Sequence, residues 1–400
     1  MGRGLNEYIR KDAMYPTDAH IVGIYEHPVR KAEGISLAQL HADVARGAVE
    51  DAGLSLSDID GYFCAADAPG IGAMTMAQYL GLDLRYTDST ETGGSSYIGH
   101  VHHAALAIAA GKCDVALVTC ADNQVASRKF IGLGGVDWRG APEQPFEDGY
   151  YFGPASLYGM VAQRHMHEFG TTSEQLAWVK VAASHHAQHN PNAMLRDMVT
   201  VEDVVSSPLV AAPLRRLDCC VMSDGGGAIV LTRPEIAKSL KRPLVRLRGA
   251  GEAVKHNSGG RVDLTYSAGR ESGRAAFAEA GITPADIQYA SLYDSFTITV
   301  IMQIEDLGFC EKGQGGRFVA DGNLISGVGK LPFNTDGGGL CNNHPGNRGG
   351  MTKLLEAVRQ LRGEAHPAVQ VPDCSLSVAH GTGGSLAGYH GSATAILERV

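Results

Sequence analysis

Two polar side chains of this sequence, one after an apolar segment and one in a predicted turn, could do acid–base chemistry. Tyr293 comes directly after an apolar run that ends at Leu292, and His344 lies in the segment Asn-His-Pro-Gly. A tyrosine hydroxyl can donate a proton to a substrate hydroxyl or, if its pKa of about 10 is lowered, accept one. A neutral imidazole N–H can stabilise an oxygen on which negative charge develops. A core tyrosine with a satisfied hydroxyl, and a histidine that only caps a turn, are the alternatives.

The cysteines and histidines of the chain give weaker signals. Its eight cysteines form no Cys-x-x-Cys pair, and most lie in apolar segments, as is typical of reduced thiols in the cytoplasm. Cys341, three residues before His344, could be a nucleophile, but a small buried residue is the more common role. His185 and His189 have the spacing of a zinc-binding pair, yet no third ligand accompanies them. We therefore expect no metal site.

Composition excludes several classes of function. The net charge is −9 and there is no basic run, so nucleic acid is not an expected partner. The N-terminus has no charged-then-apolar signal, and no apolar run reaches about 18 residues. We expect a cytoplasmic protein that does not insert into membranes. The chain has 51 glycines, and some of them form clusters, such as Gly225–Gly227, Gly337–Gly339 and Gly383-Gly384. We expect these clusters to be tight turns or close backbone contacts.

Two segments, 45–64 and 273–292, repeat one pattern of elements. Each predicts a helix, a glycine stop (Gly53 and Gly281), a turn that contains an aspartate, and a strand that enters the core. The offset between Cys64 and Leu292 is 228 residues, too long for a solenoid. It indicates a duplicated α/β half-domain, and we expect the chemistry where the two halves meet.

The other elements fit two halves, 1–238 and 239–400. Strands and helices alternate up to about residue 125, which predicts a sheet covered by helices. Residues 121–210 break this alternation and predict an inserted loop region that covers the active site. The remaining predictions are strands at 20–25, 61–65, 114–120, 228–231, 289–292, 375–379 and 393–397, and helices at 36–52, 96–110, 155–169, 173–188, 296–307 and 350–361.

An ordered set of motifs resembles the thiolase superfamily, specifically its sterol-carrier or lipid-transfer-type branch, over nearly the whole chain. The motifs are Cys220-Val-Met-Ser-Asp-Gly-Gly-Gly-Ala, Tyr293-Asp-Ser-Phe-Thr, Glu305-Asp-Leu-Gly-Phe-Cys, Leu331-Pro-Phe-Asn-Thr-Asp-Gly-Gly-Gly and Asn343-His-Pro-Gly. The resemblance implies an α/β fold of duplicated βαβαβαββ halves in a five-layer α-β-α-β-α arrangement. This agrees with the internal repeat, which rests on different residues.

The sequence departs from that family at both catalytic cysteines. The family's nucleophile stands at the start of a helix, where its thiol pKa is lowered. The matching position here is Gly94, in Glu-Thr-Gly-Gly-Ser-Ser, and Ser95 could replace the thiol only with an adjacent base; N-capping is the alternative role. The second cysteine, of a Cys-x-Gly-Gly turn, is replaced by His380 or Gly381. Chemistry through an acyl-enzyme is therefore not expected.

The resemblance implies a candidate site. His344 matches the family's oxyanion-hole histidine, and Tyr293 matches a tyrosine of the thiolase-like aldolases that shorten steroid side chains. In an ungapped match the second proposed catalytic tyrosine of those aldolases falls on His344. The site therefore resembles a hybrid, with a thiolase-type histidine in an aldolase-type site that lacks the cysteines. The implied catalytic residues are Tyr293, His344, Asp294 as a support of Tyr293, and His380. The implied substrate-binding residues are Gly94, Ser95, Ser223, Asn343 and Gly383.

The function that this resemblance implies is retro-aldol cleavage of a β-hydroxyacyl-CoA, with no cofactor other than the coenzyme A thioester of the substrate. A thiolase-type acyltransferase that uses Ser95, Cys341 or a partner's thiol is the first alternative, and a non-catalytic lipid-binding subunit is the second. The resemblance also implies a homodimer, and a small partner with an OB-fold and zinc ribbon that would form a heterotetramer. Arg215, Arg216 or Arg348 could bind the coenzyme A phosphates.

Overall fold

One hydrogen-bonded order of strands runs through both halves of the molecule. The computed structural model of the chain describes residues 18–127, 153–256, 261–346, 349–386 and 388–400. Two residue pairs, His20 with Arg246 and Ile21 with Val245, join the strands of the first half to those of the second. The order is β3 (Tyr86–Asp88), β2 (Gly61–Phe63), β4 (Val115–Asp122), β7 (Gly225–Thr232), β1 (His20–Glu26), β8 (Val245–Lys255), β11 (Gly388–Arg399), β10 (Leu376–Ser385) and β9 (Tyr289–Leu292).

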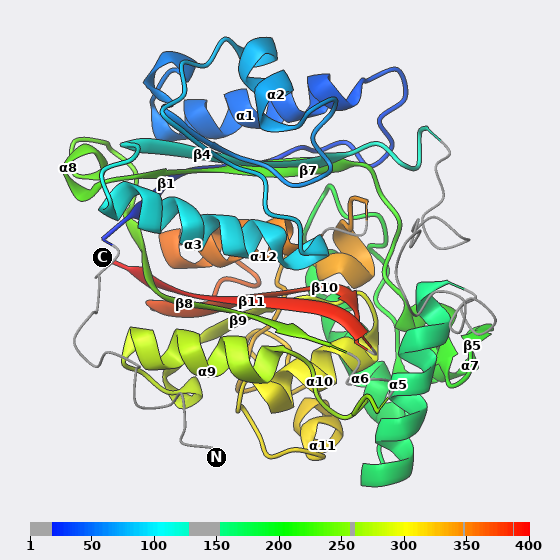
Figure 1. Cartoon of the computed structure of the whole chain (residues 1–400). Helices are drawn as coiled ribbons and strands as arrows, with labels where there is room; N and C mark the ends of the chain where they lie inside the picture. The colour runs from blue at the N-terminus through cyan, green and yellow to red at the C-terminus, as the bar shows by residue number, and fades with distance from the viewer. Residues whose placement is uncertain (1–17, 128–152, 257–260, 347–348, 387) are drawn as a thin grey trace, which may run out of the picture.

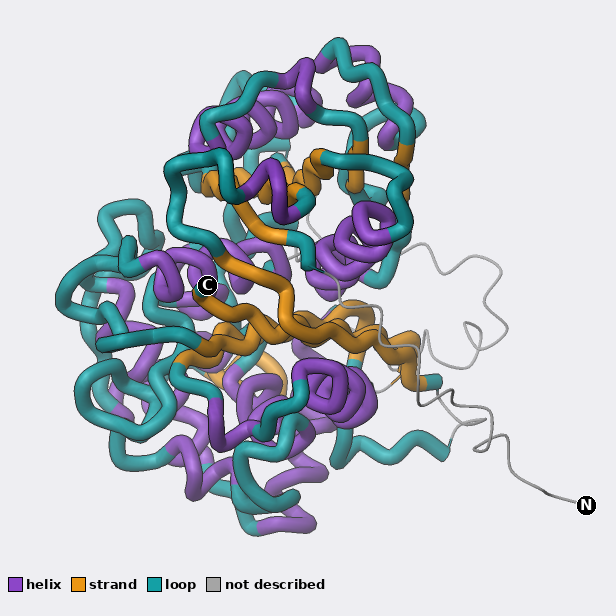
Figure 2. The backbone as a smooth tube through the Cα atoms, turned by 90° about the vertical axis from the view of Figure 1, so that its left-hand side faces the viewer, coloured by secondary structure: helices purple, strands orange, loops and turns teal. Residues whose placement is uncertain are grey.

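The strands of the two halves form separate layers that alternate with helices (Figure 1). Helices α1 (Leu37–Ala52) and α2 (Ala73–Leu80) cover the outer face of the first strand layer. Helices α3 (Ser96–Ala109) and α12 (Gly350–Arg362) lie between the two strand layers, which Figure 2 shows from the side. The second layer is covered by α9 (Gly269–Ala280), α10 (Thr297–Asp306) and α11 (Gly315–Val319). These five layers confirm the fold that the sequence predicts.

The described part of the predicted insertion is mainly helical. It contains α5 (Pro154–Phe169), α6 (Ser173–Ala187) and α7 (Val201–Ser206), and the hairpin of β5 (Leu209–Ala211) and β6 (Leu214–Arg215) extends across its predicted end at residue 210. These elements stand at one side of the stack (Figure 1). Residues 128–152 of the insertion lie outside the described residues.

The internal repeat is confirmed element by element. Helices α1 and α9 both end at a left-handed glycine, Gly53 with φ 72° and Gly281 with φ 65°. A 3-10 turn with a capping box follows each helix, at Leu56–Asp58 and Pro284–Asp286, and leads into β2 or β9. The same local chemistry therefore delivers a strand to each of the two layers.

Several boundaries differ from the prediction. Gly225–Gly227 is not a turn, because it forms the start of β7, where a Cβ on Gly226 would lie 2.0 Å from the Cys120 carbonyl oxygen. The expectation of a close backbone contact there is correct. Strands β10 and β11 extend well beyond the predicted 375–379 and 393–397 because they form a hairpin, and Gly383 lies inside β10 rather than in a turn. Strand β8 was not predicted, although it joins the halves.

Glycines let the covering helices approach both strand layers closely. A Cβ on Gly23 of β1 would lie 2.1 Å from the Ala48 carbonyl oxygen of α1, and one on Gly251 of β8 would lie 2.2 Å from the Ser272 carbonyl oxygen of α9. Below these contacts the buried apolar residues fill the spaces on both sides of each layer. Among the described residues, no helix combines the length and apolar character that crossing a membrane requires.

The close contact of α9 with β8 predicts a large effect of a small substitution. Gly251→Ala should lower the free energy of unfolding by about 3 kcal/mol, because α9 must move to admit the methyl group. Val254→Ala, on the same strand but with 73% of its surface exposed, is the control and should change stability by less than about 0.5 kcal/mol. Denaturant unfolding measures both; equal effects would contradict this account of the packing.

Candidate active site

Tyr293 and His344 lie against each other between the two halves of the chain. Their ring centroids are 5.3 Å apart, with the ring planes at 77° in an edge-to-face arrangement. Tyr293 follows β9 directly, and its backbone N–H donates to the His380 carbonyl oxygen of β10 at 3.0 Å. Both side chains are nearly buried, with 4% and 2% of their surfaces exposed. The structure therefore brings together the two residues that the sequence singles out first.

Gly94 provides the space that the tyrosine hydroxyl occupies. A Cβ at Gly94 would lie 2.4 Å from both Cε2 and the hydroxyl oxygen of Tyr293. No residue with a side chain, and hence no cysteine, fits at this position while Tyr293 keeps its place. The absence of the family's nucleophile and the presence of the tyrosine are thus one packing feature.

The N-termini of α3 and α12 meet at the same place. A Cβ on Gly350, the first residue of α12, would lie 1.9 Å from the Gly94 carbonyl oxygen, just before α3. The Gly349 N–H donates to the Tyr293 hydroxyl oxygen at 3.3 Å. A helix N-terminus carries a partial positive charge, which favours an anion nearby. The site therefore has a field suited to developing negative charge.

Asp294 holds the turn that leads to His344. Its carboxylate accepts hydrogen bonds from the Gly339 and Leu340 N–H groups at 2.8 and 3.0 Å, and from the Lys353 ammonium at 2.9 Å. Burial alone would raise the pKa of Asp294, but Lys353 and the two amides lower it. The turn, Gly338–Asn342, is π-helical and fully buried. In this geometry Asp294 supports the neighbouring residues and does not face an open space.

Ser223 and Asn343 fix the backbone at His344. The Ser223 hydroxyl donates to the Asn343 side-chain oxygen at 2.6 Å and accepts from the His344 N–H at 2.8 Å. The Asn343 side-chain N–H donates in turn to Glu26 at 3.2 Å. Both residues are buried. Their polar atoms are engaged within the protein, so the structure gives them a supporting place; contact with substrate stays a prediction.

Ser95 and Gly383 pack around the segment before α3. The Ser95 hydroxyl donates to the Thr92 carbonyl oxygen at 2.8 Å, and it makes no capping bond to α3, so the capping interpretation is wrong. A Cβ on Gly383 would lie 1.6 Å from that same carbonyl oxygen. No base is hydrogen-bonded to Ser95 within the described part of the chain. This arrangement does not support Ser95 as a nucleophile.

His380 lies on the other face of β10 from this site. Neighbouring side chains alternate between the faces of a strand, and a Cβ on Gly381 would lie 3.1 Å from Ser95 Cα, on the site side. His380 instead faces the start of α9, where a Cβ on Gly269 would lie 3.1 Å from its ring, and its Nδ1 is 2.8 Å from the hydroxyl of Thr394 on β11. Burial lowers the pKa of His380 to about 3. The geometry therefore does not support the catalytic role predicted for His380. Of the two residues that could replace the family's second cysteine, Gly381 is the one that faces the site.

A network of buried ionic groups lies beneath the site. Glu26 contacts Arg30 at 2.8 Å and Arg359 at 2.9 Å. Burial would raise the pKa of Glu26, but Arg359 and Arg30 lower it to about 2. Burial, reinforced by nearby Asp336, raises the pKa of Glu356 to about 7, even though Arg359 contacts its carboxylate. Glu356 is thus the member of this network that titrates near neutral pH.

Sequence reasoning missed the two buried lysines next to the 338–342 turn. Lys353 of α12 pairs with Asp294, and Lys180 of α6 donates to the Leu340 carbonyl oxygen at 2.7 Å and to Cys341 Sγ at 3.1 Å. The available signal for Lys180 was a lysine within the apolar run Leu-Ala-Trp-Val-Lys-Val-Ala-Ala. Cys341 is fully buried, and burial raises its thiol pKa. A raised pKa argues against a nucleophilic role.

The other residues considered as ligands do not join this site. His189 stacks on His366 at 4.9 Å, and the described residues contain no group of three or more side chains suited to a metal ion. Arg215 donates to the Ser207 carbonyl oxygen, Arg216 is exposed, and Arg348 lies outside the described residues.

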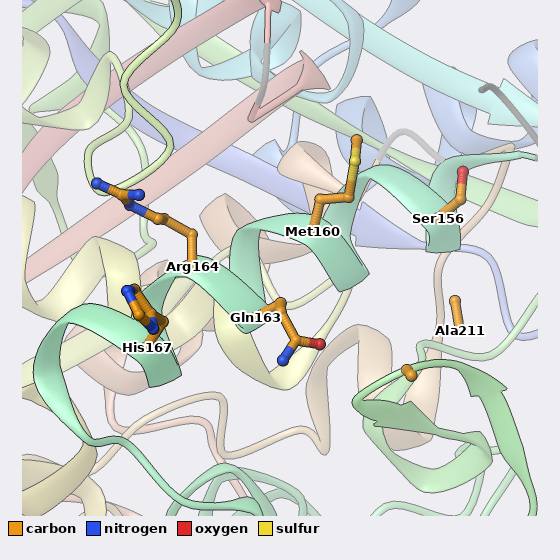
Figure 3. A pocket seen from close by; sticks show the side chains of 7 residues that line it. Ser156, Met160, Gln163, Arg164, His167 and Ala211 are labelled. Atoms are coloured by element: carbon orange, nitrogen blue, oxygen red, sulfur yellow. The ribbon is translucent and has the colours of Figure 1, made fainter. Parts of the chain in front are cut away.

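A separate groove of about 540 Å³ lies beside α5 (Figure 3). It is lined by Ser156, Met160, Gln163, Arg164, His167, Ala211 and Ala212.

Glu356 predicts a pH-dependent effect on stability. Its pKa is about 7 in the folded chain and about 4.5 when unfolded, so the fold loses stability as pH rises from about 4.5 to 7 and loses no more above that. Glu356→Gln should therefore gain stability relative to the wild type between pH 5 and pH 8, by about 2 kcal/mol. Urea unfolding at both pH values tests this, with the exposed Glu50→Gln as control. A difference between variant and wild type that stays constant with pH would contradict the assignment.

Comparison with known proteins places the chain in a family. The model of the Thiolase C-terminal domain-like family matches residues 251–399. A 17-hydroxy-3-oxo-4-pregnene-20-carboxyl-CoA lyase from Mycobacterium tuberculosis is 35% identical, covering 88% of this chain and 93% of the lyase. An acetyl-CoA acetyltransferase from Methanothermobacter thermautotrophicus is 32% identical, covering 92% and 97%. The solved structure of the Ltp2-ChsH2(DUF35) aldolase has a TM-score of 0.86 at 33% identity, covering 96% of this chain and 98% of that one.

These relatives include enzymes of two chemistries, and the site geometry separates them. The sequence resemblance matches Gly94 to the position of the nucleophilic thiol, and the Tyr293 ring fills the space beside Gly94. The sequence resemblance is confirmed: the chain belongs to the thiolase superfamily, and within it to the sterol-carrier-type, thiolase-like aldolases.

Proposed function

We propose that the chain cleaves the Cα–Cβ bond of a β-hydroxyacyl-CoA by a retro-aldol step. The observation that carries this proposal is the Tyr293 hydroxyl, which occupies the space at Gly94 where a nucleophilic side chain would otherwise stand. A steroid side chain is the first acyl group to test, because the lyase relative is named for a pregnene carboxyl-CoA. The products are a shorter acyl-CoA and a ketone or aldehyde.

The step balances without a redox partner. A base removes the proton of the β-hydroxyl, and the oxygen lone pair becomes the new carbonyl bond as the Cα–Cβ bond breaks. The released electron pair moves into the thioester as an enolate, and a proton then returns to Cα. Nothing is oxidised or reduced overall. We propose that the reaction needs no cofactor besides the coenzyme A thioester that the substrate itself carries.

The residues around the site can serve the two charged stages of this step. We assign the removal of the β-hydroxyl proton to Tyr293. We assign the stabilisation of the enolate oxygen to His344, since a fixed N–H donor stabilises an oxyanion in a buried site. The Gly349 N–H donates to the tyrosine oxygen, and the N-termini of α3 and α12 add positive field. Asp294 acts as a positioning residue, because its carboxylate is bound by two amides and Lys353.

Removal of the tyrosine hydroxyl tests the proposal. Tyr293→Phe should lower kcat/KM for retro-aldol cleavage by about 100-fold or more, since a positioned acid or base contributes that much. Tyr62→Phe is the matched control: Tyr62 is buried and bonded to Thr119 at 2.6 Å, but it lies away from the site. Both fragments of a β-hydroxyacyl-CoA are followed by mass spectrometry, with and without a small OB-fold partner. Cleavage by Tyr293→Phe within about threefold of wild type would refute the assigned role.

A thiolase-type acyltransferase is the second candidate, favoured by the acetyl-CoA acetyltransferase relative. The two chemistries differ in whether the substrate becomes attached to the protein. Under the retro-aldol proposal, acid-quenched turnover mixtures should contain no acylated protein by intact mass. Cys341→Ser should retain cleavage within about threefold, because this thiol is buried and its pKa is raised. An acyl adduct on the wild type that is lost in Cys341→Ser would establish the acyltransferase instead.

We also propose an assembly for the working enzyme. Strand β3 stands at one end of the order and pairs only with β2 among the described strands, which leaves an edge that a second copy could extend. The Ltp2-ChsH2(DUF35) aldolase is named as a pair of components. We propose that this chain likewise works with a second component, a small subunit with an OB-fold and zinc ribbon, and that two copies of the chain pair with each other. All eight cysteines are free thiols, which supports the cytoplasm as the compartment.

A further inference from the structure

The buried ammonium of Lys180 is not explained by the roles assigned so far. Lys180 lies on α6, in the inserted region, with 1% of its surface exposed. Its Nζ donates to the Leu340 carbonyl oxygen at 2.7 Å and to Cys341 Sγ at 3.1 Å. In the part of the chain that the structure describes, no carboxylate lies within 4.0 Å of it. Both of its acceptors belong to the 338–342 turn.

A buried charge whose hydrogen-bond acceptors are all neutral is costly to the fold, even though the Asp218 carboxylate attracts it from farther away. An ammonium group loses several kcal/mol of hydration on burial, roughly, and an apolar side chain of similar volume is often at least as stable. Packing alone would therefore favour methionine or leucine at position 180. The contacts of Lys180 with the 338–342 turn therefore point to a role besides stability.

Lys180 and Asp294 hold opposite polar groups of the same turn. Asp294 binds the N–H groups of Gly339 and Leu340, whereas Lys180 binds the Leu340 carbonyl oxygen. The peptide groups at Leu340 are thus fixed by an anion on one side and a cation on the other. The His344 ring rests on this turn, since a Cβ on Gly339 would lie 3.0 Å from its Cδ2. A shift of the turn would consequently move the imidazole.

We propose that Lys180 is a positioning residue for His344, through which helix α6 of the inserted region sets the oxyanion donor of the site. This inference rests on the proposed function for its effect on catalysis. Its structural part, the immobilisation of the 338–342 turn, is independent of the reaction. Misplacement of a reacting group by about 1 Å can cost about 100-fold in rate.

Lys255 offers a matched control for this proposal. It is also buried, with 6% of its surface exposed, and its ammonium donates to the backbone carbonyl oxygens of Asp263, Tyr266 and Leu386. Like Lys180, it has no carboxylate within 4.0 Å among the described residues. It does not touch the 338–342 turn. Replacing either lysine by methionine removes a buried ammonium and leaves a side chain of similar length.

The test compares Lys180→Met and Lys255→Met in the full chain. Hydrogen exchange followed by mass spectrometry reports on peptides that span residues 337–346. Lys180→Met should speed exchange there by about 10-fold or more, through local opening of the turn. It should lower kcat for cleavage by about 10- to 100-fold with little change in KM. Lys255→Met should leave both readouts within about threefold of wild type, and Lys180→Gln, which keeps one donor, should recover part of kcat.

Each outcome bears on one of the two claims. If the wild type cleaves no β-hydroxyacyl-CoA, the proposed function fails, while the exchange data still decide whether Lys180 holds the turn. Unchanged exchange in Lys180→Met overturns the proposal whatever the activity. Faster exchange with an unchanged kcat overturns it as well, because the turn would then not position a catalytic group. Equal effects of the two methionine variants would show a general loss of stability; if Lys180→Met does not fold, Lys180→Gln carries the comparison.

Discussion

The site depends on one buried carboxylate, that of Asp294. The residue directly follows Tyr293 in the chain, and its two oxygens bind the backbone of a turn that ends just before His344. A buried carboxylate is stable only when its charge is fully compensated, and Lys353 with the two amides provides this compensation. The spacing of the tyrosine and histidine rings therefore follows from an ionic contact that neither ring makes.

The two halves of the molecule contribute unequally to this arrangement. The second half supplies Tyr293, Asp294, His344 and helix α12, whereas the first half supplies Gly94, Ser223 and the start of α3. The ionic network around Glu26 then ties β1 of the first half to α12 and to the side chains of Asn342 and Asn343 of the second. A duplicated fold thus provides two similar scaffolds, and its functional groups come mostly from one of them.

The sequence predicted the fold better than it predicted the site. The repeat of helix, left-handed glycine, capped turn and strand is local chemistry, so it could be recognised from Gly53 and Gly281 without an alignment. The pairing of Tyr293 with His344 followed from motifs. The face of β10 to which His380 points did not, because a one-residue change in register exchanges the two faces of a strand. The role of Lys180 could not be predicted for another reason: its apolar neighbours indicate burial, but its acceptors are 160 and 161 residues away, a backbone carbonyl and a thiol.

The contact between Gly94 and Tyr293 also limits how enzymes of this family can change chemistry. A cysteine introduced at position 94 alone would collide with the phenol, and loss of the phenol alone would leave a void with neither a thiol nor a hydroxyl. A lineage that changes between acyl transfer through a cysteine thiol and retro-aldol cleavage with a tyrosine hydroxyl must therefore cross an inactive intermediate or change both positions together. Ancestors with a small residue at each of the two positions would have been the permissive route, and such sequences are the ones to seek among living relatives.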